Sequence, residues 1–165
     1  MNSIFSRRSY RKFKDVEVEK EKIDMIIRAG MQAPSACDQR PWEFIVVTNK
    51  EKINKLASAT PYSMCVKNSN IAIVPCYRNS GLKKPEYVIC DMSACVENML
   101  IEAIELGLGG VWIGGAPNEE RVNTIREILN IEKRLVPFCI IPVGYPIIKK
   151  DLDNRYDSTR IHYVN

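Results

Sequence analysis

The segment from Glu86 to Leu106 constrains the fold more than any other part of this 165-residue chain. Apolar residues recur through it at the three- and four-residue intervals of one helix face. A helix of that length spans about 30 Å at 1.5 Å per residue. We therefore expect it to run through the middle of the domain or along a subunit interface. The apolar stripe comprises Ile89, Met92, Val96, Met99, Leu100 and Ala103.

Shorter elements of both kinds surround this predicted helix. Short apolar runs rich in strand-forming residues predict strands, and amphipathic spacing behind a capping residue predicts helices. The predicted strands are 44–47, 71–77, 111–113 and 137–145, and the other predicted helices are 18–33, 50–59 and 119–129. Thr48 or Asn49 would cap the second of these helices and Asn118 the third. Segment 60–70 has turn chemistry and no periodicity.

The chain has the length of one domain and no internal repeat, so residues 1–165 are expected to form a single unit. A composition of 45% hydrophobic and 27% charged residues is typical of globular proteins. No apolar run approaches the roughly 20 residues that cross a bilayer. The basic N-terminus also lacks the apolar stretch of a signal peptide, so the expected location is cytoplasmic, without a membrane partner.

Six cysteines and one histidine limit the metal chemistry to expect. None of the cysteines form a CxxC pair and several lie in apolar runs, so the sequence predicts buried, reduced thiols. One histidine gives little support to a zinc site of the usual type, and an iron–sulfur cluster would need clustered cysteines. No metal is therefore expected. The cysteines are Cys37, Cys65, Cys76, Cys90, Cys95 and Cys139.

A cluster of positive residues near the N-terminus points to a small anion. The net charge of +4 is too small to imply nucleic acid by itself, but the first segment is basic and is followed at once by acidic residues. Guanidinium groups bind phosphate oxygens bidentately, and a serine hydroxyl adds a neutral donor. The segment therefore predicts a phosphate clamp, with a solvated basic arm as the alternative. Its residues are Arg7, Arg8, Ser9, Tyr10 and Arg11.

The glycine-rich segment near residue 110 does not match the usual nucleotide-binding loops. A GxGxxG loop would need glycine where Trp112 stands, and a Walker loop would need lysine where Ala116 stands. A GxSxG nucleophile is also missing from the sequence. A nucleotide bound here would therefore be a mononucleotide held by arginines, and a flavin would itself carry the redox chemistry.

Four sequence blocks, in this order and spacing, resemble the shorter members of the FMN-dependent nitroreductase family, from Arg7 to about His162. The blocks are RRSYRKF at 7–13, APSACDQRPW at 33–42, the segment 91–115 that ends in GLGGVWIGG, and VGYP with RYD at 143–157. The resemblance implies an α+β fold, a three-layer α/β/α sandwich with a central mixed, mostly antiparallel sheet, in an intertwined homodimer. It also implies one FMN-binding domain whose residues 149–165 pack on the partner subunit.

The same resemblance implies which residues bind the cofactor. The FMN phosphate and ribityl chain would be held by Arg7, Arg8, Ser9 and Arg11, with a late basic contact from Arg155. The flavin ring would be contacted by Pro34, Ser35 and Ala36 of the other subunit. Gly114 and Gly115 would bring backbone N–H groups toward the reactive ring nitrogen. No side chain would then be an obligatory catalytic residue, because the flavin carries the chemistry.

Two positions depart from the family pattern. Asp38 stands where the family usually has asparagine, and Arg40 stands where glutamine is common. An ionised aspartate accepts hydrogen bonds but cannot donate them, so a flavin contact by Asp38 would lose an amide N–H. Local pairing of Asp38 with Arg40 is the alternative. Trp42 and Trp112 are expected to be core or scaffold residues and not to stack on the ring.

The resemblance implies an FMN-dependent oxidoreductase that moves two electrons from NADH or NADPH to a nitroaromatic, quinone or similar small-molecule acceptor by a ping-pong route. Dehalogenation, azoline oxidation and flavin destruction occur on the same fold. Substrate choice is expected to reside in segments 60–70 and 78–86. An alternative from another class is a non-enzymatic protein whose basic arm, with Tyr10 and Phe13, binds nucleic acid or an acidic partner.

Overall fold

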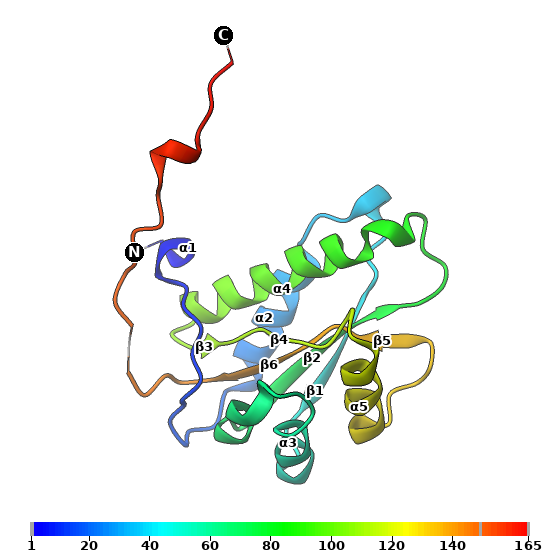
Figure 1. Cartoon of the computed structure of the whole chain (residues 1–165). Coiled ribbons are helices and arrows are strands. Elements are labelled where there is room, and N and C mark those ends of the chain that lie inside the picture. Colours follow the sequence, from blue (N-terminus) through cyan, green and yellow to red (C-terminus); the bar gives the residue numbers. More distant parts are fainter. Residues whose placement is uncertain (1, 149, 165) are drawn as a thin grey trace.

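The computed structural model describes residues 2–148 and 150–164, and these form three layers with a β-sheet in the middle (Figure 1). Helices α2 (Lys20–Met31) and α4 (Val88–Glu105) cover one face of the sheet, while α3 (Lys50–Leu56) and α5 (Glu119–Leu129) cover the other. The predicted three-layer sandwich is confirmed. Lys149 and Asn165, the two ends of the predicted tail, lie outside the described residues.

The central sheet is antiparallel in every pairing between its named strands. The strands are β1 (Trp42–Val47), β2 (Ile71–Arg78), β3 (Gly109–Gly110), β4 (Ile113–Gly114), β5 (Leu135–Pro137) and β6 (Cys139–Gly144). Their order is β1-β2-β6-β3, with β4 also paired to β6 and β5 to β2. A parallel bridge between Ser9 and Gly110 makes the sheet mixed, as expected.

Local capping explains where the helices begin. The side chain of Asn49 accepts a hydrogen bond from Lys52 N at the start of α3, and Asn118 accepts one from Arg121 N at the start of α5. Shorter helical segments are α1 (Ser3–Ser6) and the 3₁₀ turns η1 (Ala36–Asp38), η2 (Ser63–Asn68), η3 (Pro85–Tyr87) and η4 (Ser158–Arg160). The turn η2 lies within the segment predicted as a loop.

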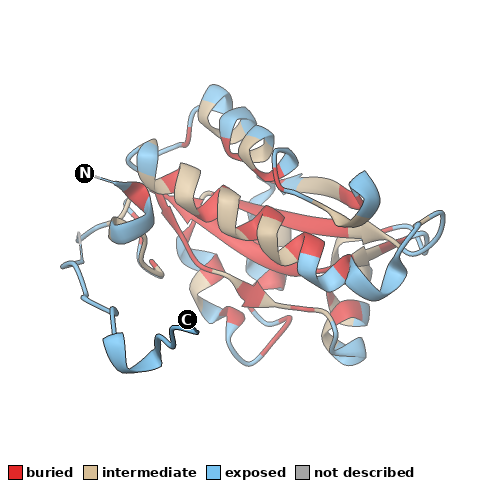
Figure 2. Cartoon of the chain, turned by 90° about the horizontal axis from the view of Figure 1, so that it is seen from above, coloured by how far each residue is buried: buried red, intermediate tan, exposed pale blue. Residues whose placement is uncertain are grey.

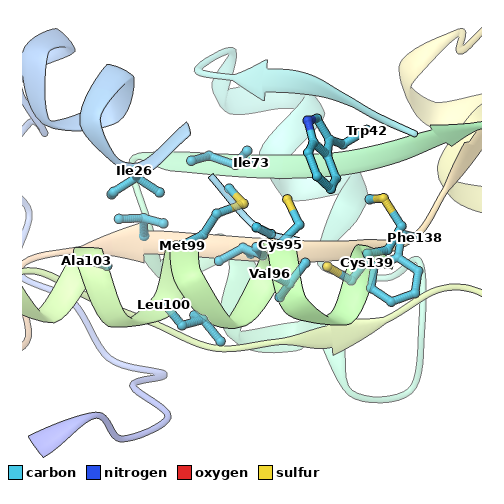
Figure 3. Close-up of a cluster of buried hydrophobic side chains, with 14 of the residues drawn as sticks. Ile26, Trp42, Ile73, Cys95, Val96, Met99, Leu100, Ala103, Phe138 and Cys139 are labelled. Atoms are coloured by element: carbon cyan, nitrogen blue, oxygen red, sulfur yellow. The ribbon is translucent and has the colours of Figure 1, made fainter. Parts of the chain in front are cut away.

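Helix α4 lies at the centre of the larger core, as its apolar stripe predicted. Met99 and Cys95 point from it toward Ile73 of the sheet and Ile26 of α2 (Figure 3). Gly30 lets α2 approach closely, since a Cβ there would lie 2.8 Å from Met99 Cγ. Figure 2 shows buried residues running along α4 and the sheet below it.

A second core fills the opposite face of the sheet. Ile53 and Leu56 of α3 and Ile125 of α5 pack there against Val74 and Ile140 of the central strands. The two cores together hold both layers of helices against the sheet. Within the described residues, no helix is long and apolar enough to cross a membrane.

The predicted strand 137–145 is divided by a β-bulge at Phe138. Cys76 pairs with Pro137 and Ile73 pairs with Ile141, so the five residues 137–141 lie opposite the four residues 73–76 of β2. The extra residue bends the strand and turns its backbone out of register. The predicted strand 111–113 is likewise replaced by β3 and β4, two residues each.

The prediction that the cysteines are buried was right for three of the six. Cys76, Cys95 and Cys139 are buried, and burial raises the pKa of Cys76 and of Cys95 to about 12. Cys37 and Cys90 are exposed, whereas Cys65 is partly buried. Cys90 lies on the face of α4 opposite the apolar stripe, and Cys37 lies in a surface loop. All six are free thiols, as predicted.

Candidate functional site

The basic arm, residues 7–14, is fixed to the sheet by two aromatic rings. Tyr10 and Phe13 are buried, and each ring lies where a glycine has no side chain. A Cβ on Gly109 would lie 2.5 Å from the Tyr10 ring, and one on Gly144 would lie 3.0 Å from Phe13 Cβ. Because both rings face the protein, neither is available to stack on bases. This burial removes the aromatic contacts that the nucleic-acid alternative assigned to Tyr10 and Phe13.

Backbone pairing places the arm beside the glycine-rich segment. Ser9 forms a parallel bridge with Gly110, and Tyr10 N donates to Gly110 O at 2.9 Å. In Figure 1 the dark-blue N-terminal segment runs past β3. The predicted phosphate clamp therefore lies beside Gly110, about a hundred residues later in the chain. The predicted flavin-contact glycines, Gly114 and Gly115, follow Gly110 by four and five residues.

Three of the predicted basic residues line one cavity of about 540 Å³: Arg7, Arg8 and Arg155. Arg8 Nη1 donates to the carbonyl oxygens of Phe5 and Arg7, at 3.1 and 2.8 Å. Its Nη2 atom is buried and has no hydrogen-bond partner among the described residues. A buried guanidinium N–H without an acceptor is costly, so an anion in this cavity would stabilise the arrangement.

The other two arginines of this cavity have acidic neighbours. Arg7 Nε lies 2.9 Å from Glu97 Oε1 of α4, close enough for an ion pair but at an angle too poor for a hydrogen bond. Arg155 Nε donates to Asp153 Oδ2 at 3.0 Å, and this pair is largely exposed. Arg7 therefore fastens the arm to α4 through charge, and both Arg7 Nε and Arg8 Nη2 are buried N–H groups without an acceptor among the described residues.

Arg11 and Ser9 are placed differently from the other predicted clamp residues. Arg11 lines a neighbouring cavity of about 340 Å³ together with Lys12 and Lys150. Ser9 lines neither cavity, and its carbonyl oxygen accepts a hydrogen bond from Lys150 Nζ at 2.9 Å. The structure thus brings Arg7, Arg8 and Arg155 together and leaves Ser9 and Arg11 outside their cavity. Lys150, which sequence reasoning missed, is a further cation at this end of the arm.

The two predicted contact glycines differ from each other. A Cβ on Gly114 would meet nothing within 4 Å, whereas a Cβ on Gly115 would lie 3.1 Å from Ile125 Cδ1 and 3.1 Å from Phe138 O. Gly115 N also donates to Phe138 O at 2.9 Å. This bond makes Gly114 and Cys139 a pair without mutual hydrogen bonds, so the Gly114 N–H points away from β6. Gly114 is thus the glycine with open space beside it.

The loop that contains Pro34, Ser35 and Ala36 has an unusual backbone. Cys37, Asp38 and Arg40 have φ values of 50°, 52° and 44°, a region that residues other than glycine rarely occupy. Ser35 Oγ accepts a hydrogen bond from Arg40 N at 3.0 Å. Strained backbone of this kind persists only where surrounding contacts fix it, and it is common at functional sites.

Asp38 pairs with Arg40, which was the alternative to a flavin contact. Arg40 Nε and Nη2 donate to the two carboxylate oxygens at 2.6 and 2.7 Å. These hydrogen bonds, with the positive charge of Arg40, lower the pKa of Asp38. Asp38 is therefore ionised at neutral pH and can only accept hydrogen bonds from a ligand.

Helix α4 holds the two parts of the predicted site apart within one chain. Asp91 of α4 contacts Ala36, whereas Glu97 contacts Arg7. Six residues of helix separate these anchors, about 9 Å along the axis at 1.5 Å per residue. Among the residues lining the cavity of Arg7 and Arg8, none comes from 34–36. This separation fits a site that a second subunit completes.

The two tryptophans are scaffold residues, as predicted. Trp42 is buried in the larger core (Figure 3), and the Trp112 ring packs on Phe138 with centroids 5.4 Å apart. Within residues 2–148 and 150–164, no three His, Cys, Asp or Glu side chains are grouped to hold a metal ion.

The chain is similar to known proteins in both sequence and structure. The sequence matches the family model described as "Nitroreductase family" over residues 4–68 and 64–145. A protein of Methanothermobacter thermautotrophicus, provisionally named as an NADH dehydrogenase/NAD(P)H nitroreductase, is 43% identical over 162 residues, which are 98% of this chain and 85% of that protein.

Two solved structures resemble this chain over nearly their whole length. An FMN-dependent nitroreductase from Clostridium difficile superposes with a TM-score of 0.90 at 36% identity, covering 99% of this chain and 98% of that one. A provisionally named nitroreductase from Desulfovibrio desulfuricans, solved in complex with FMN, gives a TM-score of 0.84 at 26% identity, covering 99% and 95%.

Proposed function

This chain belongs to the nitroreductase family, and on that premise we propose that it transfers two electrons from NADH or NADPH to a nitroaromatic, quinone or similar acceptor by a ping-pong route. It is an FMN-dependent NAD(P)H oxidoreductase, since its relatives include an FMN reductase that uses NADPH, an FMN-dependent nitroreductase and a nitroreductase solved in complex with FMN. When FMN is bound, its isoalloxazine ring accepts a hydride from the reduced nicotinamide and passes the electrons to the acceptor.

The observation that carries this proposal is the buried Nη2 atom of Arg8. It lacks a hydrogen-bond partner among the described residues, and Arg8 lines a cavity together with Arg7 and Arg155. A phosphate oxygen is the acceptor that a guanidinium group binds best. The residues present therefore fit the phosphate of FMN, with Arg8 as its principal ligand and Arg155 as a second cation from the tail.

Other residues would hold the rest of the cofactor. Ser9 and Arg11, on the same arm, would contact the ribityl chain or phosphate from the adjacent cavity. Gly114 leaves open space for the flavin ring, and its N–H points away from β6. Gly115 would shape the strand turn beside it, because its own N–H already donates to Phe138 O. Asp38 would take part only as an acceptor.

The protein is proposed to act as a homodimer with the flavin between subunits. Residues 150–164 are exposed throughout (Figure 2) and extend away from the body of the chain (Figure 1). They nevertheless include large apolar side chains, namely Leu152, Tyr156, Ile161, Tyr163 and Val164. A second subunit would cover them, and it would also bring its own Pro34, Ser35 and Ala36 to the flavin ring.

Titration of the purified protein with FMN tests the proposal. We expect a yellow protein with one FMN per chain. In anaerobic stopped-flow mixing, NADH or NADPH should reduce the bound flavin. Parallel double-reciprocal plots with a quinone or nitroaromatic acceptor are expected for the ping-pong route. A protein that gains no flavin absorbance from added FMN would refute the assignment, and intersecting plots would refute the route.

A further inference from the structure

Asp91 is a buried carboxylate in the first turn of α4, among the otherwise largely apolar buried residues of that helix. The residue is only 4% exposed. Its Oδ1 atom accepts a hydrogen bond from Ala36 N at 2.9 Å, and its Oδ2 atom accepts one from Gln39 Nε2 at 2.6 Å. Both oxygens are therefore used to hold the loop of residues 34–40.

We propose that Asp91 is the positioning residue that fixes the 34–40 loop in the conformation that contacts the flavin. This inference rests on the proposed function, which assigns Pro34, Ser35 and Ala36 to the ring. Ala36 N is held directly by the carboxylate, and Gln39 is held through its side chain. The three residues with positive φ lie between or next to these two attachment points.

The orientation of the Gln39 amide shows why the partner must be an acceptor. Gln39 Oε1 accepts from Lys84 N at 2.9 Å, and Gln39 Nε2 donates to Lys84 O at 3.0 Å. These two backbone contacts fix which end of the amide is nitrogen. The remaining Nε2 hydrogen must then meet an acceptor, which Asp91 Oδ2 provides. An asparagine at 91 would either lose one contact or force Gln39 to turn and lose both contacts with Lys84.

The network also joins the flavin loop to the segment where substrate choice is expected. Besides the two contacts with Lys84, Arg78 Nη2 donates to Gln39 O at 3.0 Å and Lys83 Nζ donates to Cys37 O at 3.1 Å. Segment 78–84 and loop 34–40 are therefore held as one unit, with Asp91 as its buried anchor. A change at Asp91 should disturb flavin contact without removing any phosphate ligand.

The test compares Asp91→Asn with Asp24→Asn, which makes the same chemical change in an exposed i,i+4 pair of α2. Hydrogen–deuterium exchange of the full chain, with and without FMN, reports the order of the loop. We expect the amides of residues 36–40 to exchange about tenfold faster or more in Asp91→Asn, because one amide oxygen replaces the two acceptors that hold Ala36 N and Gln39 Nε2. We expect exchange of the α3 and α5 amides to be unchanged, and Asp24→Asn to match wild type throughout.

Flavin readouts separate positioning from simple loss of stability. At saturating FMN, the visible circular dichroism of the flavin should change in Asp91→Asn, because the ring meets a displaced loop. FMN affinity should fall by about tenfold. Gln39→Leu keeps the hydrogen bond between Asp91 and Ala36. We expect it to change the flavin dichroism and the FMN affinity in the same direction as Asp91→Asn. This second variant preserves the test if Asp91→Asn does not fold.

The outcomes are distinguishable. Wild-type protein that does not bind FMN would refute the proposed function, whereas the exchange experiment without FMN would still report whether Asp91 orders the loop. Normal exchange of all the amides of residues 36–40 in Asp91→Asn would overturn the positioning role. Faster exchange with unchanged flavin dichroism and affinity in both variants would overturn the link between the loop and the cofactor.

Discussion

Replacing Gly115 by alanine should destabilise the fold, whereas the same change at the neighbouring Gly114 should not. A Cβ at Gly115 would have three contacts at 3.1 to 3.3 Å, two of them with the backbone oxygens of Phe138 and Pro137. Backbone oxygens in a bulged strand pair cannot move aside without breaking their hydrogen bonds. A Cβ at Gly114 would meet nothing within 4 Å.

The magnitude follows from the cost of overpacking. Extra methyl groups in a packed interior typically cost about 1–3 kcal/mol, and in a domain of this size each kcal/mol lowers the melting temperature by roughly 2–4 °C. Gly115→Ala should therefore melt about 2–12 °C below wild type. Gly114→Ala should stay within about 0.5 kcal/mol, or gain slightly because alanine restricts the unfolded chain.

Thermal unfolding of the FMN-free proteins, followed by circular dichroism at equal concentration, measures this difference. A companion variant, Gly114→Val, should fold normally but bind FMN weakly, because its side chain occupies the open space assigned to the flavin. Equal melting temperatures for wild type and Gly115→Ala would refute the packing argument. Normal FMN affinity and reduction rate in Gly114→Val would remove Gly114 from the site.

Three further predictions concern the clamp, the tail and the thiols. Arg8→Ala should weaken FMN binding about tenfold or more in a fluorescence titration without lowering the melting temperature of the FMN-free protein; Arg134→Ala, which breaks the surface pair with Glu43, should leave the affinity unchanged. Deletion of residues 151–165 should convert a dimer to a monomer by light scattering and remove flavin absorbance, and a dimer with stoichiometric FMN would contradict the role of the tail. Stability toward urea should fall as pH rises from about 9 toward 12. The folded chain keeps the protons of Cys76 and Cys95, whose pKa burial raises to about 12, while the unfolded thiols release theirs near 9.0. A flat profile of stability against pH would contradict the burial of these two thiols.

The sequence predicted the elements whose signals are local. The stripe of α4 and the Asn118 cap of α5 depend on residues within one or two turns, so these helices were correct to within two residues. The strands near Gly110 and Phe138 were misplaced, because their ends depend on distant partners. The bulge at Phe138 depends on the register with β2, which no pattern within 135–144 encodes.

The candidate site shows the same division between local and distant signals. Arg7 and Arg8 are neighbours in the chain and share a cavity, but the separation of Arg11 from them depends on how the arm lies on β3. Asp91 could have been singled out as a charge within an apolar stripe. Its partners Ala36 and Gln39 could not have been named, because more than fifty residues separate them from it.

The contacts of Tyr10 with Gly109 and of Phe13 with Gly144 bear on how this sequence can vary. Glycine within a strand ordinarily weakens it, yet here each missing side chain leaves the space that a ring of the arm occupies. Positions 10 and 109 are therefore expected to change together in evolution, as are positions 13 and 144. A larger residue at 109 is tolerable only if the residue at 10 becomes smaller, and any mismatch would displace the arginines between the two rings and beside them.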